Sequence, residues 1–261
     1  MRQILLLVFL HLTLSSCAVT LDSPAEELEE TWKYAVVMLP AKYSAMEMTQ
    51  LAPRFYEYPS LTEWSRDLQR NHLKQSSHKI PVVLHIHGCK GIGAGDSGWA
   101  DVYGDMGYLT ILPNSFRRSN RTALCEAGRW DYRAPLRIEE IDYALKQILR
   151  IPWIDRERIF LSGFSEGGNA VSFYNGEHFA AYIIIGTDCR HAGGAPRAPK
   201  NIPVLNIVGS RDHYGYGSGC IVDRTTGGSR LVVVEGAGHD VSQQDKARLA
   251  AEGFLRECCG K

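Results

Sequence analysis

The pentapeptide Gly163-Phe164-Ser165-Glu166-Gly167 constrains this chain more than any other feature, because it directly follows the apolar run 158–162. A serine on a sharp turn from a strand into a helix has a strained backbone, and the two glycines of the motif let neighbouring backbone come close. The turn lifts the hydroxyl clear of the sheet and directs the first N–H groups of the helix at a reacting oxygen. The pattern predicts that Ser165 is a nucleophile, although the same five residues also occur without catalysis.

A nucleophilic serine needs a base to take its proton and a third group to orient that base. Two later apolar runs end in glycine-containing turns, and the first, 203–208, leads to Asp212. The second, 231–234, leads to His239. Both residues fall just past the expected carboxyl end of a strand, where open α/β sheets build their sites. The sequence therefore predicts a catalytic triad of Ser165, His239 and Asp212.

Simpler interpretations of these residues stay open. Asp212 could be an ordinary turn residue, and His239 could be an ordinary loop histidine. Other candidates for the triad fit less well, because they adjoin Asp212, follow the preceding strand or lack a strand end: His213, Asp188, His178 and His191.

The segment 81–91 is an apolar strand followed by His-Gly and a glycine-rich loop. In a serine hydrolase of this plan, one oxyanion-hole donor is the N–H after the nucleophile, here that of Glu166, and the other comes from the loop after an earlier strand. We expect the N–H of Cys89 to be that second donor. His87 is expected to be a packed, hydrogen-bonded residue that shapes the loop. The alternative is a glycine-rich turn without a catalytic part.

Residues 80–256 resemble the dienelactone hydrolase-like branch of the α/β-hydrolases. Five segments carry the resemblance: 87–89, 112–116, 163–168, 209–212 and 236–239. It implies an α/β-hydrolase fold, with a mainly parallel central sheet flanked by helices on both faces, and ester hydrolysis through an acyl-enzyme. The name-giving enzymes have a cysteine where this chain has Ser165, which favours general ester hydrolysis over dienelactone cleavage.

The N-terminus has the plan of a secretory signal, with Arg2 before an apolar stretch that is too short to span a membrane. Leu14-Ser15-Ser16-Cys17 resembles a bacterial lipobox, so we expect residues 1–16 to be removed and Cys17 to be lipidated; ordinary signal cleavage nearby is the alternative. Residues 17–30 would form a lipidated acidic tether, and 31–261 a single domain. The expected location is the cell envelope, either as an outer-membrane lipoprotein or in the periplasm.

Six cysteines follow Cys17, an even number in a compartment that favours disulfides. The family resemblance implies the pairs Cys89 with Cys125 and Cys189 with Cys220. Cys258 and Cys259 would bond to each other or stay as thiols.

The formal net charge is zero, so the chain has no basic surface that would indicate a nucleic-acid partner. Zinc-type Cys/His spacings, a P-loop and a dinucleotide fingerprint do not occur in the sequence, so we expect no metal and no cofactor. The expected partners are a small-molecule ester and the membrane that holds the lipid anchor.

Apolar runs and helical spacing alternate along the chain, which predicts strands and helices in alternation. The expected strands are 81–87, 108–113, 158–164, 181–186, 203–208 and 230–235, with a further edge strand within 34–39. The expected helices are 61–74, 137–150, 166–175 and 241–257.

Six arginines lie between Ser115 and Ile138, against two acids. Two interpretations are open: the arginines bind a substrate carboxylate, or they satisfy acids and carbonyls of the protein itself. Two alternatives to an esterase also remain, a non-catalytic envelope lipoprotein and a serine peptidase of the prolyl-peptidase type.

Overall fold

The computed structural model describes residues 25–38, 40, 56–57, 79–119, 121, 125, 133–222 and 228–259. The helices over these ranges are α1 (Ala25–Lys33), α3 (Ala94–Asp105), α4 (Arg133–Ile148), α5 (Glu166–Phe173) and α6 (Asp245–Cys259), with the short 3₁₀ segments η3 (Ser115–Arg117) and η5 (Arg190–Ala192). The strands are β1 (Val36–Met38), β2 (Tyr56–Glu57), β3 (Ile80–Ile86), β4 (Leu109–Leu112), β5 (Ile154–Phe164), β6 (Tyr182–Ile185), β7 (Val204–Gly209) and β8 (Arg230–Val234).

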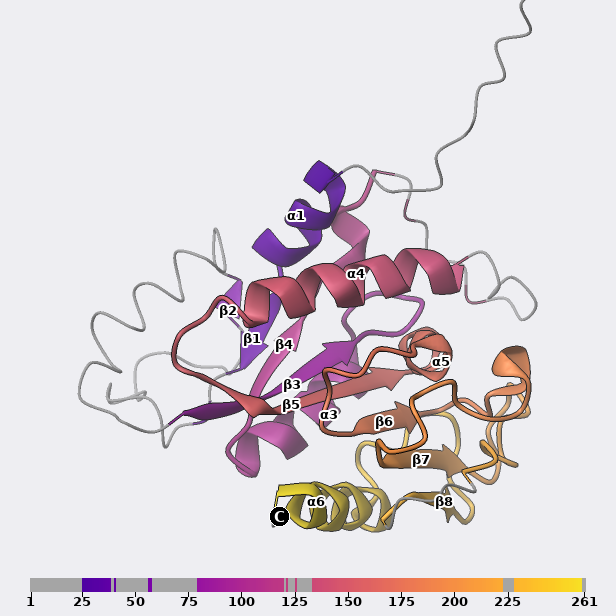
Figure 1. Ribbon diagram of the computed structural model, residues 1–261. Coiled ribbons are helices and arrows are strands. Elements are labelled where there is room, and N and C mark those ends of the chain that lie inside the picture. Colours follow the sequence, from indigo (N-terminus) through magenta and orange to yellow (C-terminus); the bar gives the residue numbers. More distant parts are fainter. Residues whose placement is uncertain are drawn as a thin grey trace, which may run out of the picture.

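The eight strands form one twisted sheet in the order β2-β1-β4-β3-β5-β6-β7-β8 (Figure 1). From β4 to β8 all neighbours are parallel, whereas β1 pairs antiparallel with both β4 and β2. The predicted α/β architecture with a mainly parallel sheet is confirmed. The strand expected within 34–39 exists as β1, but it lies inside the sheet, because β2 covers its outer side.

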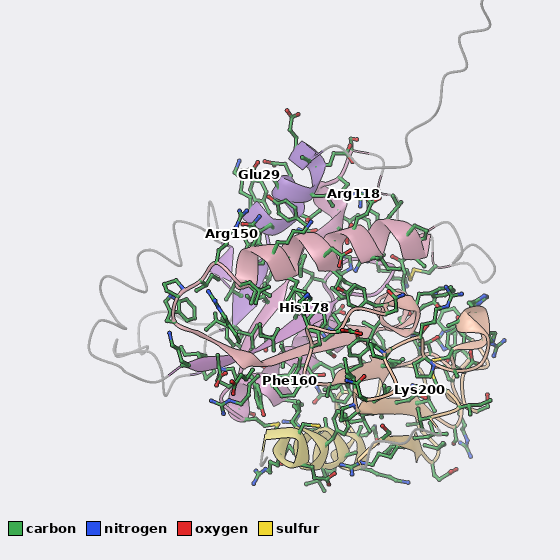
Figure 2. All side chains as sticks on the ribbon, in the orientation of Figure 1. Glu29, Arg118, Arg150, Phe160, His178 and Lys200 are labelled. Atoms are coloured by element: carbon green, nitrogen blue, oxygen red, sulfur yellow. A yellow bond between two sulfur atoms is a disulfide. The ribbon has the colours of Figure 1, made fainter. Side chains whose placement is uncertain are left out.

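The sheet is covered on both faces, which explains why β3, β4, β6 and β7 are buried at every position and mostly apolar. Val82 and Leu84 of β3 point to the layer that contains α1, α4 and α5. Val83, between them, points to the layer that contains α3 and α6. Phe160 of β5, labelled in Figure 2, is also buried in this second layer. The period-2 alternation of β3 thus divides its side chains between two cores.

Helix α1 begins within residues 17–30, which are expected to form a lipidated acidic tether. Thr31 and Trp32 are buried, and Trp32 packs in the same core as α4. Arg118, labelled in Figure 2, lies between the two helices, with its guanidinium 3.6 Å from carboxylates of both Glu27 and Glu139. Residues 25–33 therefore form a helix that packs onto the layer containing α4.

Residues 1–24, which include the predicted signal and Cys17, lie outside the described residues, as does the helix predicted for 61–74. Within the described ranges, no helix combines the length and the apolar character needed to cross a bilayer.

Candidate active site

Ser165 has the strained backbone that its motif predicts. It joins β5 to α5 with φ 57° and ψ −115°, in a region that side-chain-bearing residues rarely adopt. Its N–H donates to the carbonyl of Ile185 on β6, at 2.8 Å. A Cβ at Gly163 would lie 2.4 Å from the carbonyl oxygen of Gly167, and one at Gly167 would lie 1.8 Å from that of Ile86. Both motif glycines are therefore required by close backbone packing.

The three predicted triad side chains form a continuous hydrogen-bonded chain. His239 Nδ1 lies 2.7 Å from Asp212 Oδ2, and His239 Nε2 lies 2.9 Å from Ser165 Oγ. Since a carboxylate only accepts, Nδ1–H donates to Asp212 and Nε2 is left to accept from the serine hydroxyl. The Asp212 side chain has no exposed surface, and the N–H of Tyr214 donates to its second oxygen at 2.8 Å. The arrangement fits a nucleophile, a base and a group that orients the base.

The parallel sheet explains how residues so distant in sequence meet. Ser165 follows β5, Asp212 follows β7 and His239 follows β8, so all three lie at the carboxyl edge of the sheet. The competing candidates have other roles or places. Asp188 binds Arg190 through both carboxylate oxygens, and His178, labelled in Figure 2, is exposed.

The loop that carries Asp212 is held in place at both of its ends. It begins at Gly209, where a Cβ would lie 2.0 Å from the carbonyl oxygen of Gly238. It ends at Cys220, whose N–H donates to the buried side chain of Asn206 on β7 at 2.7 Å. The same Asn206 amide donates to the carbonyls of Ile184 and Thr187. One buried side chain thus fixes the end of this loop to the neighbouring one.

Both disulfides implied by the family resemblance are present. Cys89 is bonded to Cys125, and Cys189 to Cys220, across 36 and 31 residues of sequence. Closing loops of this length typically stabilises a fold by about 2–4 kcal/mol. Cys258 packs partly buried against the α3 and α6 layer, and the side chain of Cys259 lies outside the described part of the chain.

His87, at the end of β3, is buried and shapes the loop as predicted. Its Nε2 accepts from the N–H of Ser115 at 3.1 Å and also faces Arg137 Nη1 at 3.3 Å. Its Nδ1 therefore carries the proton and donates to the carbonyl of Gly88 at 2.7 Å. Burial, and then the positive charge of Arg137, hold the pKa of His87 well below its usual 6.5. The ring is a neutral, single tautomer that links β3 to η3.

The depressed pKa of His87 predicts that folding stability declines in mild acid. Below about pH 6.5 the unfolded chain binds a proton at His87 that the folded protein excludes. The free energy of unfolding therefore decreases as the pH is lowered, by up to about 1.4 kcal/mol per pH unit. We expect urea unfolding between pH 7.5 and 5.5 to show a shallower pH dependence in His87→Asn than in the wild type. The exposed His178→Ala variant should keep the wild-type slope. Equal slopes in His87→Asn and the wild type would contradict the assignment.

The arginines between 115 and 138 bind mainly within the protein. Arg118 and Arg137 both pair with Glu140, Arg121 pairs with Glu166, and the guanidinium of Arg117 lies over the ring of Tyr34. For these four arginines, the contacts favour the interpretation in which they satisfy the protein itself. Arg129 and the side chain of Arg133 lie outside the described residues.

A second buried polar group next to the site was not anticipated from the sequence. His85 on β3 lies 3.0 Å from Ser162 Oγ and 3.3 Å from Asp96 Oδ1. The Asp96 carboxylate also accepts from the N–H groups of Gly88 and Gly93, so it fixes the loop that contains Cys89. An acid three residues after a glycine, in the first turn of a helix, is the signal that could have revealed it.

No protein-family model matches the chain, and no curated protein sequence does. Among solved structures it is similar to Est1E from Butyrivibrio proteoclasticus, with a TM-score of 0.50 and 14% identity over 72% of this chain and 92% of that one. It is also similar to the esterase PE8 (TM-score 0.47, 19% identity, 70% and 94% covered) and to a protein described as a dienelactone hydrolase from Klebsiella pneumoniae (0.48, 14%, 72% and 90%). Together with the strand order, the likeness to Est1E establishes that the chain has the α/β-hydrolase fold.

Proposed function

We propose that the protein is a serine hydrolase that cleaves carboxylic esters through Ser165, His239 and Asp212. The observation that carries the proposal is the hydrogen-bonded position of His239 between the other two side chains, at 2.9 and 2.7 Å. A serine hydroxyl reacts with an ester carbonyl only when a base removes its proton, and this geometry provides one. The esterase name of the structural neighbour Est1E points the same way.

In the proposed reaction, Ser165 Oγ attacks the ester carbonyl carbon while His239 Nε2 takes the hydroxyl proton. The buried Asp212 carboxylate stabilises the imidazolium that forms. The carbonyl oxygen becomes an oxyanion, which accepts from the N–H groups of Cys89 and Glu166. His239 then gives its proton to the departing alcohol, which leaves an acyl group on Ser165. In the second half of the reaction, His239 takes a proton from water as the water attacks the acyl carbon, and then returns it to Ser165 Oγ as the acid is released.

We further propose that the protein is exported to the bacterial cell envelope and anchored by a lipid on Cys17. Two disulfides support an oxidising compartment, because such bonds persist outside the cytosol. The lipobox-like Leu14-Ser15-Ser16-Cys17 supports the anchor. The single domain would then begin with α1 rather than at residue 31, since α1 packs against α4.

Covalent labelling tests the proposed function directly. A fluorophosphonate probe is expected to modify the wild-type protein at Ser165, because the probe reacts only with a serine activated by its base. Peptide mapping after labelling identifies the residue, and a panel of acyl esters and short peptides then separates an esterase from a peptidase. A protein that is folded but not labelled, and that hydrolyses none of the panel, would instead fit the non-catalytic envelope lipoprotein.

A further inference from the structure

One buried guanidinium bridges the two backbone segments that would form the oxyanion hole. Arg137, near the start of α4, is only 1% exposed. Its Nη2 donates to the carbonyl of His87 at 3.0 Å, and its Nη1 lies 3.3 Å from His87 Nε2. Its Nε lies 4.0 Å from the carboxylate of Glu166. Arg137 therefore contacts the end of β3 on one side and the first residue of α5 on the other.

These two contacts lie next to the proposed oxyanion donors. Cys89 follows His87 by two residues, and Glu166 is itself the residue after Ser165. The segments approach so closely that a Cβ at Gly167 would lie 1.8 Å from the Ile86 carbonyl oxygen and 2.9 Å from that of His87. Arg137 binds that same His87 carbonyl, and it also contacts the His87 ring, whose Nδ1 donates to the Gly88 carbonyl in the same peptide as the Cys89 N–H. It therefore holds the two peptides that precede Cys89.

Charge gives Arg137 a second effect on the same site. The Glu166 carboxylate is buried one residue from the nucleophile, where a negative charge would oppose a developing oxyanion. Arg121 pairs with Glu166, and Arg137 adds a second cation beside it. Glu140 balances part of this positive charge, since it pairs with Arg137 at 3.3 Å. Arg137 therefore helps to compensate the Glu166 charge beside the proposed oxyanion hole.

We propose that Arg137 is a positioning residue that keeps the Cys89 and Glu166 N–H groups directed at one oxyanion. The inference rests on the proposed function and adds to it a residue that does not touch the substrate. Arg137 acts through the His87 carbonyl and the Glu166 carboxylate. Without Arg137, the Cys89 and Glu166 N–H groups are less firmly held relative to each other, and the negative charge of Glu166 is less compensated.

The test compares Arg137→Gln and Arg137→Lys with the matched control Arg118→Gln. Arg118 belongs to the same buried group and pairs with Glu140, but it contacts neither His87 nor Glu166 in any hydrogen bond or ion pair described above. For each variant, kcat and KM are measured on one ester. The affinity for a trifluoromethyl ketone is measured as well, because the serine adduct of this inhibitor carries an oxyanion.

In Arg137→Gln we expect kcat to fall by about 10- to 100-fold with little change in KM, since a misdirected donor acts on the transition state. Affinity for the ketone should fall by a similar factor. Arg137→Lys keeps a cation but cannot span both contacts, so its kcat should fall too. Arg118→Gln should lose stability while its kcat and ketone affinity stay near those of the wild type.

The proposal is overturned if folded Arg137 variants keep the wild-type kcat and ketone affinity, or if Arg118→Gln loses as much of both. It is also overturned if neither Arg137 variant folds, because Arg137 would then be a residue of the core. The wild type is measured in parallel. If it shows neither ester hydrolysis nor fluorophosphonate labelling, the proposed function itself is contradicted, and this result differs from a failure of the role proposed for Arg137.

Discussion

Ser165→Ala is expected to lower kcat for ester hydrolysis by about 10³-fold or more, because the residual rate then comes only from binding and the oxyanion hole. The backbone of Ser165 is set by its N–H bond to Ile185 and by the glycines beside it, so the substitution should leave the fold intact. The expected signature is a large fall in kcat with little change in the urea midpoint.

His239→Ala and Asp212→Asn should lower kcat by a similar order, about 10³- to 10⁴-fold, since the three side chains act as one unit. For the same reason, the Ser165→Ala and His239→Ala double variant should be little worse than Ser165→Ala alone. His178→Ala, an exposed histidine outside the site, is the control and should keep the wild-type rate. A Ser165→Ala protein that hydrolyses p-nitrophenyl acetate at the wild-type rate would show that the assignment is wrong.

Gly167→Ala is expected to have the second largest effect, and on stability as well as on catalysis. The new Cβ would lie 1.8 Å from the Ile86 carbonyl oxygen and 2.5 Å from its carbon. Both are backbone atoms of the central strand β3, which cannot move aside as a side chain can. We expect a loss of about 3 kcal/mol or more in the free energy of unfolding, the upper range for overpacking. The rate of fluorophosphonate labelling should fall by about 100-fold, because the proposed oxyanion donors lie just after β3 and at the start of α5, and the clash would push these two segments apart.

Gly253→Ala is the matched control for this prediction. Gly253 lies within α6, and the nearest atom to a new Cβ would be Arg230 Nη2 at 3.5 Å, an ordinary contact. Alanine is favoured over glycine inside a helix by about 1 kcal/mol, so this variant should be slightly more stable and fully labelled. Similar unfolding midpoints for the two variants would contradict the close-packing argument.

Sequence patterns predict well the strands and helices whose character is visible in a short stretch of consecutive residues. Strands β3, β6 and β7 and the second half of β5 are buried and mostly apolar. Their carboxyl ends therefore lie within two residues of the predicted bounds. Parallel pairing brings those ends to one edge, which is why Ser165, Asp212 and His239 can be grouped from the sequence alone. The disulfide pairs, in contrast, follow only from the family resemblance.

The elements that sequence patterns miss depend on tertiary contacts. Helix α3 contains Gly95 and Gly98, which weaken a helix in isolation, yet both are buried in the folded protein. A Cβ at Gly98 would lie 2.5 Å from Ser242 Oγ, so the glycine is kept for packing against a distant segment. The acidic residues of α1 dominate its composition and suggest a tether, whereas the buried Trp32 anchors the helix to the domain.

The ion pairs around Glu166 cannot be predicted for a similar reason. Arg121 and Arg137 come from different segments, and their shared partner Glu166 lies on a third. The spacing of arginines along the sequence carries no information about which acids they will meet. The sequence therefore leaves two interpretations of these arginines open, and only the folded arrangement separates them for the residues described.

Because both ends of the Asp212 loop are held in place, the residues between them can change in evolution more freely than the ends. Asn206 and the Cys189–Cys220 bond fix the far end of the loop independently of what lies between. Residues 215–219 can therefore change in length or composition while these attachment points stay in place, whereas the N–H of Tyr214 has to remain beside Asp212. The side chains of Tyr214 and Tyr216 lie beside the ring of His239, so substitutions at these two positions are expected to alter the substrate preference of the proposed hydrolase while Asp212 stays beside the histidine.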